Sequence, residues 1–244
     1  MTRIEWTERT WNPVTGCTPI SSGCNHCYAR VMARRCRAMG LHKYRNGFDV
    51  TLHDECIDEP KAWRKGSLIF VCSMGDLFHN DVPDGFIDRV MHVIRETPWH
   101  TYQILTKRAS RMRIYFKSHP VPDNVWLGVT VENRANLYRK EILVQIPATV
   151  RFLSCEPLLG PLGELDLNGI HWVIAGGESG PQARPASEWW FTDIRDEAAQ
   201  QGVPFFFKQW GTWGPDGVRR SKAANGCLLQ GEKIQQWPEP DRVD

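Results

Sequence analysis

Short apolar runs alternate with amphipathic helical patterns through the middle of the chain. The runs lack polar alternation, which is typical of strands covered on both faces in a parallel sheet. The expected strands are Ser67–Cys72, Thr101–Leu105, Val125–Val131, Val150–Leu153, His171–Ala175 and Pro204–Phe207. The expected helices are Tyr28–Met39, Pro83–Glu96, Ala109–Lys117, Asn133–Gln145 and Ser187–Gln201.

This strand–helix rhythm predicts right-handed crossovers between parallel strands. With a first strand near Trp11–Val14 it gives six or seven units. The predicted fold is α/β, a complete or partial (β/α) barrel with mostly parallel strands, and a doubly wound open sheet is the competing fold.

Two regions depart from the rhythm. Leu41–Lys65 fits no single unit, and we expect an excursion there with a short helix near Cys56–Trp63. The segment after Trp210 is rich in Gly, Pro and polar residues. We therefore expect one barrel-like domain over residues 1–210, including a loop at 16–28, and an irregular extension over residues 211–244.

Composition narrows the class of protein. The 244 residues include 30 Lys and Arg against 28 Asp and Glu, a net charge of +2, so no global basic field indicates nucleic acid. No apolar run approaches the length of a membrane span, and the first residues contain no signal-type apolar region. We expect a cytoplasmic protein without a membrane partner, in which eight cysteines are reduced thiols or metal ligands.

Three of those cysteines, Cys17, Cys24 and Cys27, lie in a loop rich in Gly, Pro and Ser that leads into a helical pattern. Their spacing is C-x6-C-x2-C. Three hypotheses are open: incidental thiols, a structural zinc with His26 or a distant residue as fourth ligand, and a 4Fe-4S cluster with one iron free for a small molecule. The chain has no second C-x2-C or H-x3-H pair, which favours the cluster over zinc.

Polar residues follow the expected strands, where α/β sheets and barrels gather their functional groups. They come after six strands, and four of these strand ends include a carboxylate. The candidates at these ends are Ser73, Asp76, Lys107, Arg108, Glu132, Cys155, Glu156, Gly176, Gly177, Glu178, Lys208, Gln209 and Trp210.

A cysteine loop after the first strand, leading into the first helix of a (β/α) barrel, resembles the radical S-adenosylmethionine (SAM) superfamily. The usual superfamily spacing is C-x3-C-x2-C, so the first gap here is a departure. The chain more closely resembles the phage-associated three-cysteine family called phage gp thirty-seven/gp sixty-eight. The stretches that carry this resemblance are Ile4–Thr7, Thr10–Pro13, the cysteine loop through Ala29, Ser73–Phe78, Leu105–Arg108, Gly128–Glu132, Ser154–Leu158, Gly176–Gly180 and Phe207–Gly211.

The superfamily resemblance implies an enzyme with two cofactors, a 4Fe-4S cluster on Cys17, Cys24 and Cys27 and SAM on the fourth iron. An external electron donor would reduce the cluster, and SAM cleavage would yield a 5′-deoxyadenosyl radical. It also implies cofactor-binding residues. Ser73 or Asp76 would meet the SAM amino group, Glu132 or Glu156 the ribose, and Gly176 and Gly177 would allow close backbone approach. Tyr28 and Glu178 complete the predicted cofactor-binding set.

The other strand-end candidates concern substrate. Lys107, Arg108 and Lys208 would place positive charge at the barrel mouth, which suits a nucleobase, nucleotide or nucleic acid. Trp210 would stack on a base, with Gln209 beside it. Cys155 is a candidate catalytic thiol that returns a hydrogen atom to a product radical, and Lys208 is the second candidate catalytic residue. The alternative function is a zinc-stabilised nucleic-acid-binding protein without radical chemistry.

Overall fold

The computed structural model describes residues 4–239, and the chain divides into two compact units. Unit 1 extends to Ile20 and includes Cys27–Gly128 and Ile146–Thr149. Unit 2 comprises Ser21–His26, Val129–Gln145 and the described residues from Val150 onward. The predicted single domain over residues 1–210, with an extension over 211–244, stays a prediction.

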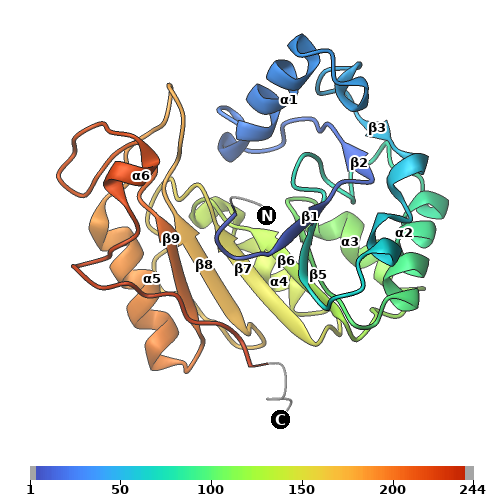
Figure 1. Ribbon diagram of the computed structural model, residues 1–244. Helices are drawn as coiled ribbons and strands as arrows, with labels where there is room; N and C mark the ends of the chain where they lie inside the picture. The colour runs from blue at the N-terminus through green and yellow to red at the C-terminus, as the bar shows by residue number, and fades with distance from the viewer. Residues whose placement is uncertain (1–3, 240–244) are drawn as a thin grey trace. The chain divides into compact units, whose positions relative to one another are not determined.

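Seven strands in the described residues form one sheet (Figure 1), in the order β1-β4-β5-β6-β7-β8-β9. β1 pairs with β4, β4 with β5, β7 with β8 and β8 with β9, all in parallel. The order follows the chain without reversal, unlike a doubly wound sheet, and within residues 4–239 it does not join β9 to β1. The predicted α/β barrel is therefore confirmed in its partial form. The strands are β1 (Arg9–Trp11), β4 (Leu68–Val71), β5 (Thr101–Thr106), β6 (Val125–Thr130), β7 (Val150–Cys155), β8 (Trp172–Gly176) and β9 (Phe205–Gln209).

The apolar strands are covered on both faces, as their sequence predicts. Every residue of β6 and every residue of β8 is buried. Such burial explains why these runs show no polar alternation.

Unit 1 contains α1 (Tyr28–Ala38), α2 (Asp84–Glu96) and α3 (Ala109–Phe116). The first strand expected near Trp11–Val14 is present but lies earlier in the chain: β1 ends at Trp11, and β2 (Val14–Thr15) pairs antiparallel with β3 (Thr51–Leu52). Pro13 lies between β1 and β2 and has no N–H for a ladder, and its carbonyl accepts a hydrogen bond from the His53 amide at 2.8 Å.

The excursion at Leu41–Lys65 holds short 3₁₀ turns. They are η2 (His42–Tyr44), η3 (Asp54–Cys56) and η4 (Glu59–Ala62), so the short helix expected near Cys56–Trp63 is the 3₁₀ turn η4. Pro60 lies in the first turn of η4 and cannot donate the backbone hydrogen bond that would extend a helix back through it.

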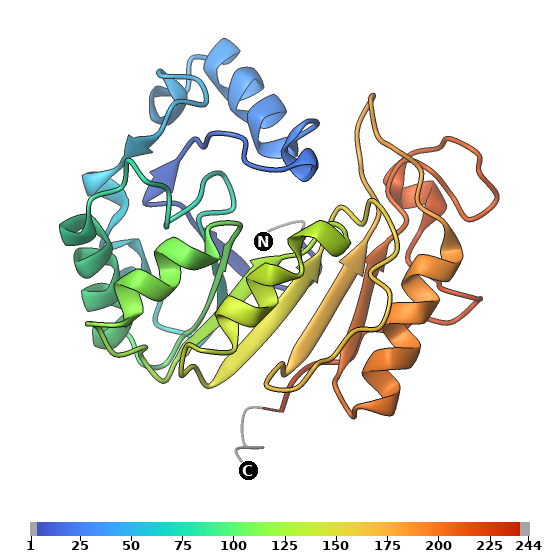
Figure 2. The ribbon, with the colours of Figure 1, turned by 180° about the vertical axis from the view of Figure 1, so that it is seen from behind.

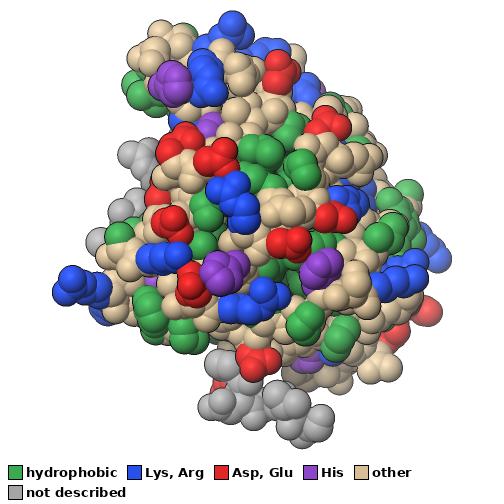
Figure 3. Space-filling view, turned by 90° about the vertical axis from the view of Figure 1, so that its right-hand side faces the viewer, with side chains coloured by type: hydrophobic (Ala, Val, Ile, Leu, Met, Phe, Trp, Pro, Cys, Tyr) green, Lys and Arg blue, Asp and Glu red, His purple; other side chains and the backbone are tan. Residues whose placement is uncertain are grey.

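The surface over α2 carries charges of both signs, and Figure 3 shows them interspersed there. Lys61 pairs with Asp58 at 2.8 Å and with Glu96 at 2.7 Å. Arg89 pairs with Asp54 at 2.5 Å. This face of unit 1 therefore has no field of a single sign.

Unit 2 contains α4 (Tyr138–Leu143), α5 (Glu188–Gln200) and α6 (Lys222–Asn225). The helix expected over Asn133–Gln145 is shorter, because a 3₁₀ turn η5 (Arg134–Asn136) precedes α4. α5 runs along β9 (Figure 2), where the Phe191 and Phe207 ring centroids are 5.1 Å apart.

The C-terminal segment also packs on β9. Its Ile234 carbonyl accepts from the Phe207 amide at 2.8 Å, and its Gln236 amide donates to the Phe205 carbonyl at 3.0 Å. The Trp237 ring stacks on Trp172 with centroids 5.0 Å apart. Within the described residues, no helix is both long enough and apolar enough to cross a membrane.

Candidate functional site

The first part of the cysteine loop is held by Arg108, which lies two residues after the carboxyl end of β5. Its Nη1 donates to Cys17 Sγ at 3.3 Å, and its Nη2 donates to the carbonyl and hydroxyl oxygens of Thr18, both at 3.0 Å. A planar guanidinium has several donors in a fixed fork, so one side chain can make all three contacts.

A buried carboxylate, Asp76, fixes Arg108 in this position. Arg108 Nη1 lies 3.0 Å from Asp76 Oδ2, and the two side chains are 8% and 7% exposed. The Thr106 hydroxyl and the Phe78 amide donate to Asp76 Oδ1 at 2.7 and 3.0 Å. The pKa of Arg108 is raised, because the charges of Asp76 and Cys17 outweigh the opposing effect of burial.

His79 reaches the same loop. Its Nε2 lies 2.7 Å from the Thr18 hydroxyl, and the pKa of His79 is lowered by burial and by the charge of Arg108. Lys107, between Thr106 and Arg108, is half-buried.

Cys27 lies at the start of α1 and packs against Ala29, Ala33 and Met74. The Tyr28 hydroxyl donates to the Ser73 carbonyl at 2.6 Å, although 56% of Tyr28 is exposed. The Ser73 hydroxyl donates to Asn12 Oδ1 at 3.1 Å. These contacts tie the head of α1 to the segment after β4.

In unit 2, the middle of the cysteine loop is held by Glu132, which follows β6. The Ser21 hydroxyl donates to Glu132 Oε1 at 2.5 Å. Gly23 contacts the same carboxylate so closely that a Cβ at this position would lie 2.5 Å from Glu132 Oε1. Arg139 Nη1 lies 2.8 Å from Glu132 Oε2, with side chains 1% and 0% exposed, and also donates to the Thr130 carbonyl at 2.8 Å.

All eight cysteines are free, and Cys17, Cys24 and Cys27 are half-buried. Cys24 Sγ lies 3.8 Å from the Ser21 hydroxyl. His26 Nδ1 is buried and has no hydrogen-bond partner in the described part of the chain. Over residues 4–239, no three His, Cys, Asp or Glu side chains form a group that could hold a metal ion.

Glu156 and Lys208 meet at the carboxyl ends of β7 and β9. Lys208 Nζ lies 3.2 Å from Glu156 Oε1, and the Ser154 hydroxyl donates to Glu156 Oε2 at 3.4 Å. A Cβ on Gly176 would lie 2.6 Å from Glu156 Oε1, so the glycine leaves room for this carboxylate.

Cys155, the last residue of β7, is fully buried. Burial raises the pKa of its thiol, and the neighbouring carboxylates of Glu156 and Glu132 raise it further. The thiol is therefore protonated at neutral pH.

Three further candidates, Gly177, Gln209 and Trp210, contact backbone or core residues of unit 2. A Cβ on Gly177 would lie 1.9 Å from the Trp210 carbonyl oxygen. Gln209 donates to the Gly177 carbonyl at 2.9 Å. Trp210 is 2% exposed, packs against Phe191 and Phe207, and donates to the Leu228 carbonyl at 2.8 Å. The structure thus gives the Trp210 ring no open face for a base.

Glu178 forms a bidentate ion pair with Arg184, whose Nε and Nη2 donate to the Glu178 carboxylate at 2.8 and 2.6 Å. Burial by itself would raise the pKa of Glu178, but the Arg184 hydrogen bonds outweigh it and the pKa is lowered. Glu178 is thus a carboxylate that is already partnered.

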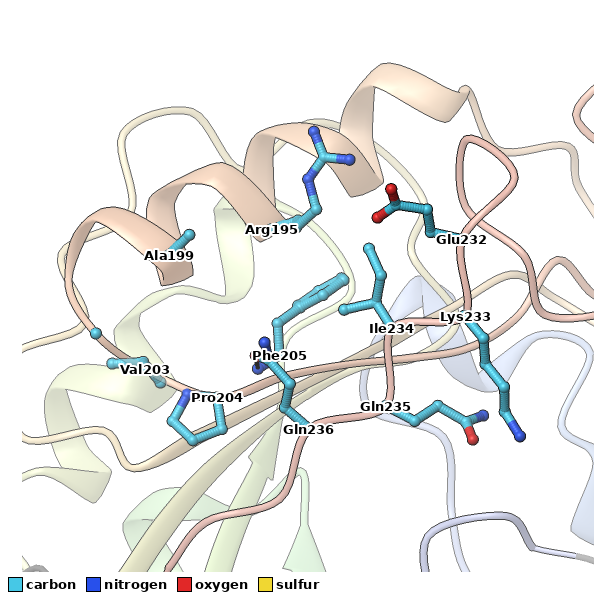
Figure 4. A pocket seen from close by; sticks show the side chains of 11 residues that line it. Arg195, Ala199, Val203, Pro204, Phe205, Glu232, Lys233, Ile234, Gln235 and Gln236 are labelled. Atoms are coloured by element: carbon cyan, nitrogen blue, oxygen red, sulfur yellow. Dashed lines mark hydrogen bonds between the residues drawn. The ribbon is translucent and has the colours of Figure 1, made fainter.

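A groove of about 790 Å³ lies at the other end of β9, bounded by α5 and the C-terminal segment. Figure 4 shows Arg195, Glu232 and Ile234 around it, with Phe205 at its base. None of the predicted site residues lines it. The groove is therefore separate from the candidate site.

Several residues of the site were not predicted from the sequence. Arg139 lies in a helical stretch whose polarity resembles any solvated face, so nothing in the pattern indicates its burial. Thr106 and Ser154 could have been predicted as site residues, because each directly follows an expected strand. Arg184 follows the Gly-rich strand end without a pattern of its own.

The family described as "Protein of unknown function (DUF5131)" matches residues 1–238. The chain belongs to this family. No curated protein is significantly similar to it.

Two solved structures are similar to this chain. One is a spore photoproduct lyase variant with bound AdoMet and dinucleoside spore photoproduct, at 9% identity and a TM-score of 0.43, covering 68% of this chain and 55% of that protein. The other is spore photoproduct lyase complexed with dinucleoside spore photoproduct, at 8% identity and a TM-score of 0.39, covering 77% and 59%. The chain spans a little over half the length of each.

Proposed function

We propose that this protein is an iron–sulfur enzyme of the radical-SAM type. In this proposal Cys17, Cys24 and Cys27 hold a 4Fe-4S cluster whose fourth iron takes SAM. The observation that carries the proposal is that strand-end polar groups hydrogen-bond to the cysteine loop in both units. Arg108, paired with Asp76, contacts Cys17 and Thr18, while Glu132, paired with Arg139, contacts Ser21.

The donor chemistry of the loop fits such a cluster. Its three thiols are free and half-buried. A zinc ion needs its ligands around one point, whereas a cluster binds each cysteine at a different iron. When bound, the cluster would supply the electron that cleaves SAM to a 5′-deoxyadenosyl radical.

The protein's own residues would bind the cofactors and orient the cysteine loop. Arg108 donates a charged hydrogen bond to Cys17 Sγ and would stabilise its thiolate form. Asp76 already accepts from three donors, so we assign it to the orientation of Arg108 rather than to the SAM amino group. Ser73 is then the better candidate for that amino group.

Glu132 is equally committed to loop residues and to Arg139, which favours Glu156 as the ribose ligand. Glu156 Oε1 is buried and, apart from the Lys208 ion pair, has no hydrogen-bond partner in the described residues. Buried polar atoms are normally hydrogen-bonded, so an oxygen in this state suits an incoming hydroxyl.

Cys155 and the basic residues concern the substrate. A hydrogen-atom donor must be a thiol rather than a thiolate, and the raised pKa of Cys155 keeps it in that form. Lys107 and Lys208 would favour an anionic substrate, and we propose a nucleobase, nucleotide or nucleic acid. An external electron donor, a cytoplasmic location and the phage association are parts of the same proposal.

Reductive cleavage of SAM tests this function. The full chain is reconstituted with iron and sulfide without oxygen and reduced with dithionite, and 5′-deoxyadenosine is measured by chromatography. We expect product from the wild type and from C36A, and none from C24A, since both are half-buried free cysteines and only one belongs to the loop. Stoichiometric zinc without iron, or equal product from C24A, would contradict the proposal.

A further inference from the structure

The segment after the cysteine loop is strongly basic. Residues 28–48 hold six Lys and Arg and no Asp or Glu, which leaves 24 cations against 28 carboxylates in the rest of the chain. Outside this segment the chain is therefore net acidic. The nearest carboxylate in sequence is Asp49, directly after the segment.

Three of these cations form what we call the arginine face: Arg34, Arg35 and Arg37, all exposed on α1. Figure 3 shows Lys and Arg side chains gathered at the top of this view, where Figure 1 places α1 and the segment after it. Positive and negative side chains alternate below them. The charge is thus local to the α1 segment of unit 1.

No ion pair holds any of the six cations in the described chain. Arg30 lies over the Phe48 ring at 5.7 Å, Arg45 contacts His42, and Lys43 donates to Cys56 Sγ at 3.1 Å. Elsewhere in unit 1, Arg89, Arg108 and Arg111 each pair with an aspartate. The arginine face therefore keeps its charge for an external anion.

Apolar side chains lie among these arginines. Tyr28, Val31, Met32 and Met39 are 56%, 42%, 44% and 74% exposed. Tyr28 and Met32 are four residues apart, so they stand on one side of α1, next to Arg35. The buried side of α1 is occupied by Ala29 and Ala33.

We propose that the α1 segment binds the sugar–phosphate backbone of a nucleic acid, with the arginine face on phosphates and the Tyr28–Met32 side toward bases. Five of the six cations are arginines, whose planar fork matches phosphate oxygens. Interfacial helices bury Trp, Phe or Leu in a membrane, and α1 has none of these residues. The role of this surface in binding a substrate depends on the proposed function. It narrows the substrate class of the proposed enzyme to nucleic acid.

Fluorescence anisotropy of the full chain, without cluster, tests the surface. The probes are a fluorescein-labelled single-stranded DNA of about 20 nucleotides and its duplex, titrated between 50 and 200 mM NaCl, a range over which phosphate contacts change affinity strongly. The variant is R34E/R35E/R37E. The matched control is R64E/K65E/K117E, which changes the same charge at exposed positions of unit 1.

We expect the arginine-face variant to bind about 10- to 100-fold more weakly at 100 mM salt. We also expect its slope of log K against log [salt] to fall by about 2, from three lost phosphate contacts on a single strand. The control should bind within about twofold of wild type. Equal loss in both variants, no DNA binding by the wild type, or binding to phosphatidylserine vesicles in place of DNA would each overturn the proposal.

Iron content separates this proposal from the proposed function. A variant that loses DNA binding but keeps the wild-type cluster supports the surface. A wild type that binds DNA through the arginine face but never assembles a cluster overturns the enzyme and leaves the surface standing.

Discussion

Two buried carboxylate–arginine pairs contact the cysteine loop, and they do so in opposite ways. In unit 1 the arginine faces the loop: Arg108 contacts Cys17 and Thr18, while Asp76 lies behind it. In unit 2 the carboxylate faces the loop: Glu132 contacts Ser21, while Arg139 lies behind it. A positive charge therefore lies beside a cysteine sulfur in the first pair, whereas the second acts through a serine hydroxyl.

The difference separates two roles. Under the proposed function, in which Cys17 binds the cluster, Arg108 would influence the electronic state of that ligand, because it donates to the sulfur itself. The Glu132–Arg139 pair contacts the loop through the Ser21 hydroxyl and the Gly23 backbone. The first pair should therefore affect cluster properties, and the second should affect stability and loop order.

Breaking the more deeply buried pair should have the largest effect on stability. Arg139→Met leaves the fully buried Glu132 without its cation, and we expect a loss of about 3–5 kcal/mol in the free energy of unfolding, measured by urea denaturation. Lys140→Met is the control, because its partner Asp166 is 71% exposed and can be hydrated. A loss of less than about 1 kcal/mol from Arg139→Met would show that the pair does not stabilise the fold.

Breaking the Arg108–Asp76 pair in unit 1 should cause a smaller loss of stability and should also change the midpoint potential of the cluster. Arg108→Met should cost about 2–3 kcal/mol, because Asp76 keeps its bonds from Thr106 and Phe78. The reconstituted cluster should also be harder to reduce, with a more negative midpoint potential, once the positive charge beside Cys17 is removed. Arg111→Met, whose partner Asp84 is 56% exposed, should leave that potential unchanged.

In unit 2, Gly23 lies in close contact with the Glu132 carboxylate. Gly23→Ala places a methyl group against Glu132, so the loop must shift, and we expect less than half of the wild-type iron content after reconstitution. Gly160→Ala has nothing within 4 Å of the added methyl group and should keep full iron content. Equal iron in both variants would mean that this contact does not position the loop.

Removal of the Ser21 hydroxyl should have the smallest effect on stability among the changes to the loop contacts. Ser21→Ala removes the bond to Glu132, and we expect a loss of about 1–2 kcal/mol together with faster amide hydrogen exchange at Cys24. Ser22→Ala removes only a 3.4 Å contact with Asn133 and should show neither change.

The free energy of unfolding should depend only weakly on pH, with one contributing histidine in each unit. Burial, with nearby positive charge, lowers the pKa of His53 in unit 1 and of His171 in unit 2. The unfolded chain then binds more protons than the folded chain below the ordinary histidine pKa of about 6.5, so stability falls as the pH drops through that value. Urea midpoints that stay constant from pH 7.5 to 5.5 would contradict this expectation.

The sheet was predictable because its strands are apolar on both faces and its helices are amphipathic. The short elements were not: β2 and β3 have two residues each, and their pairing depends on the chain turning at Pro13. The position of the candidate residues at strand ends was predictable, because polar residues directly follow the apolar runs. Their partners were not, since the burial of Arg139 and the hydrogen bonds of Ser21 depend on tertiary packing.

The number of irons and sulfides per chain tests the central claim most directly. We predict about four of each after anaerobic reconstitution of the wild type, with loss of the cluster in C17A, C24A and C27A and retention in C36A. One zinc per chain without sulfide, or about four irons retained in the three loop variants, would contradict the account.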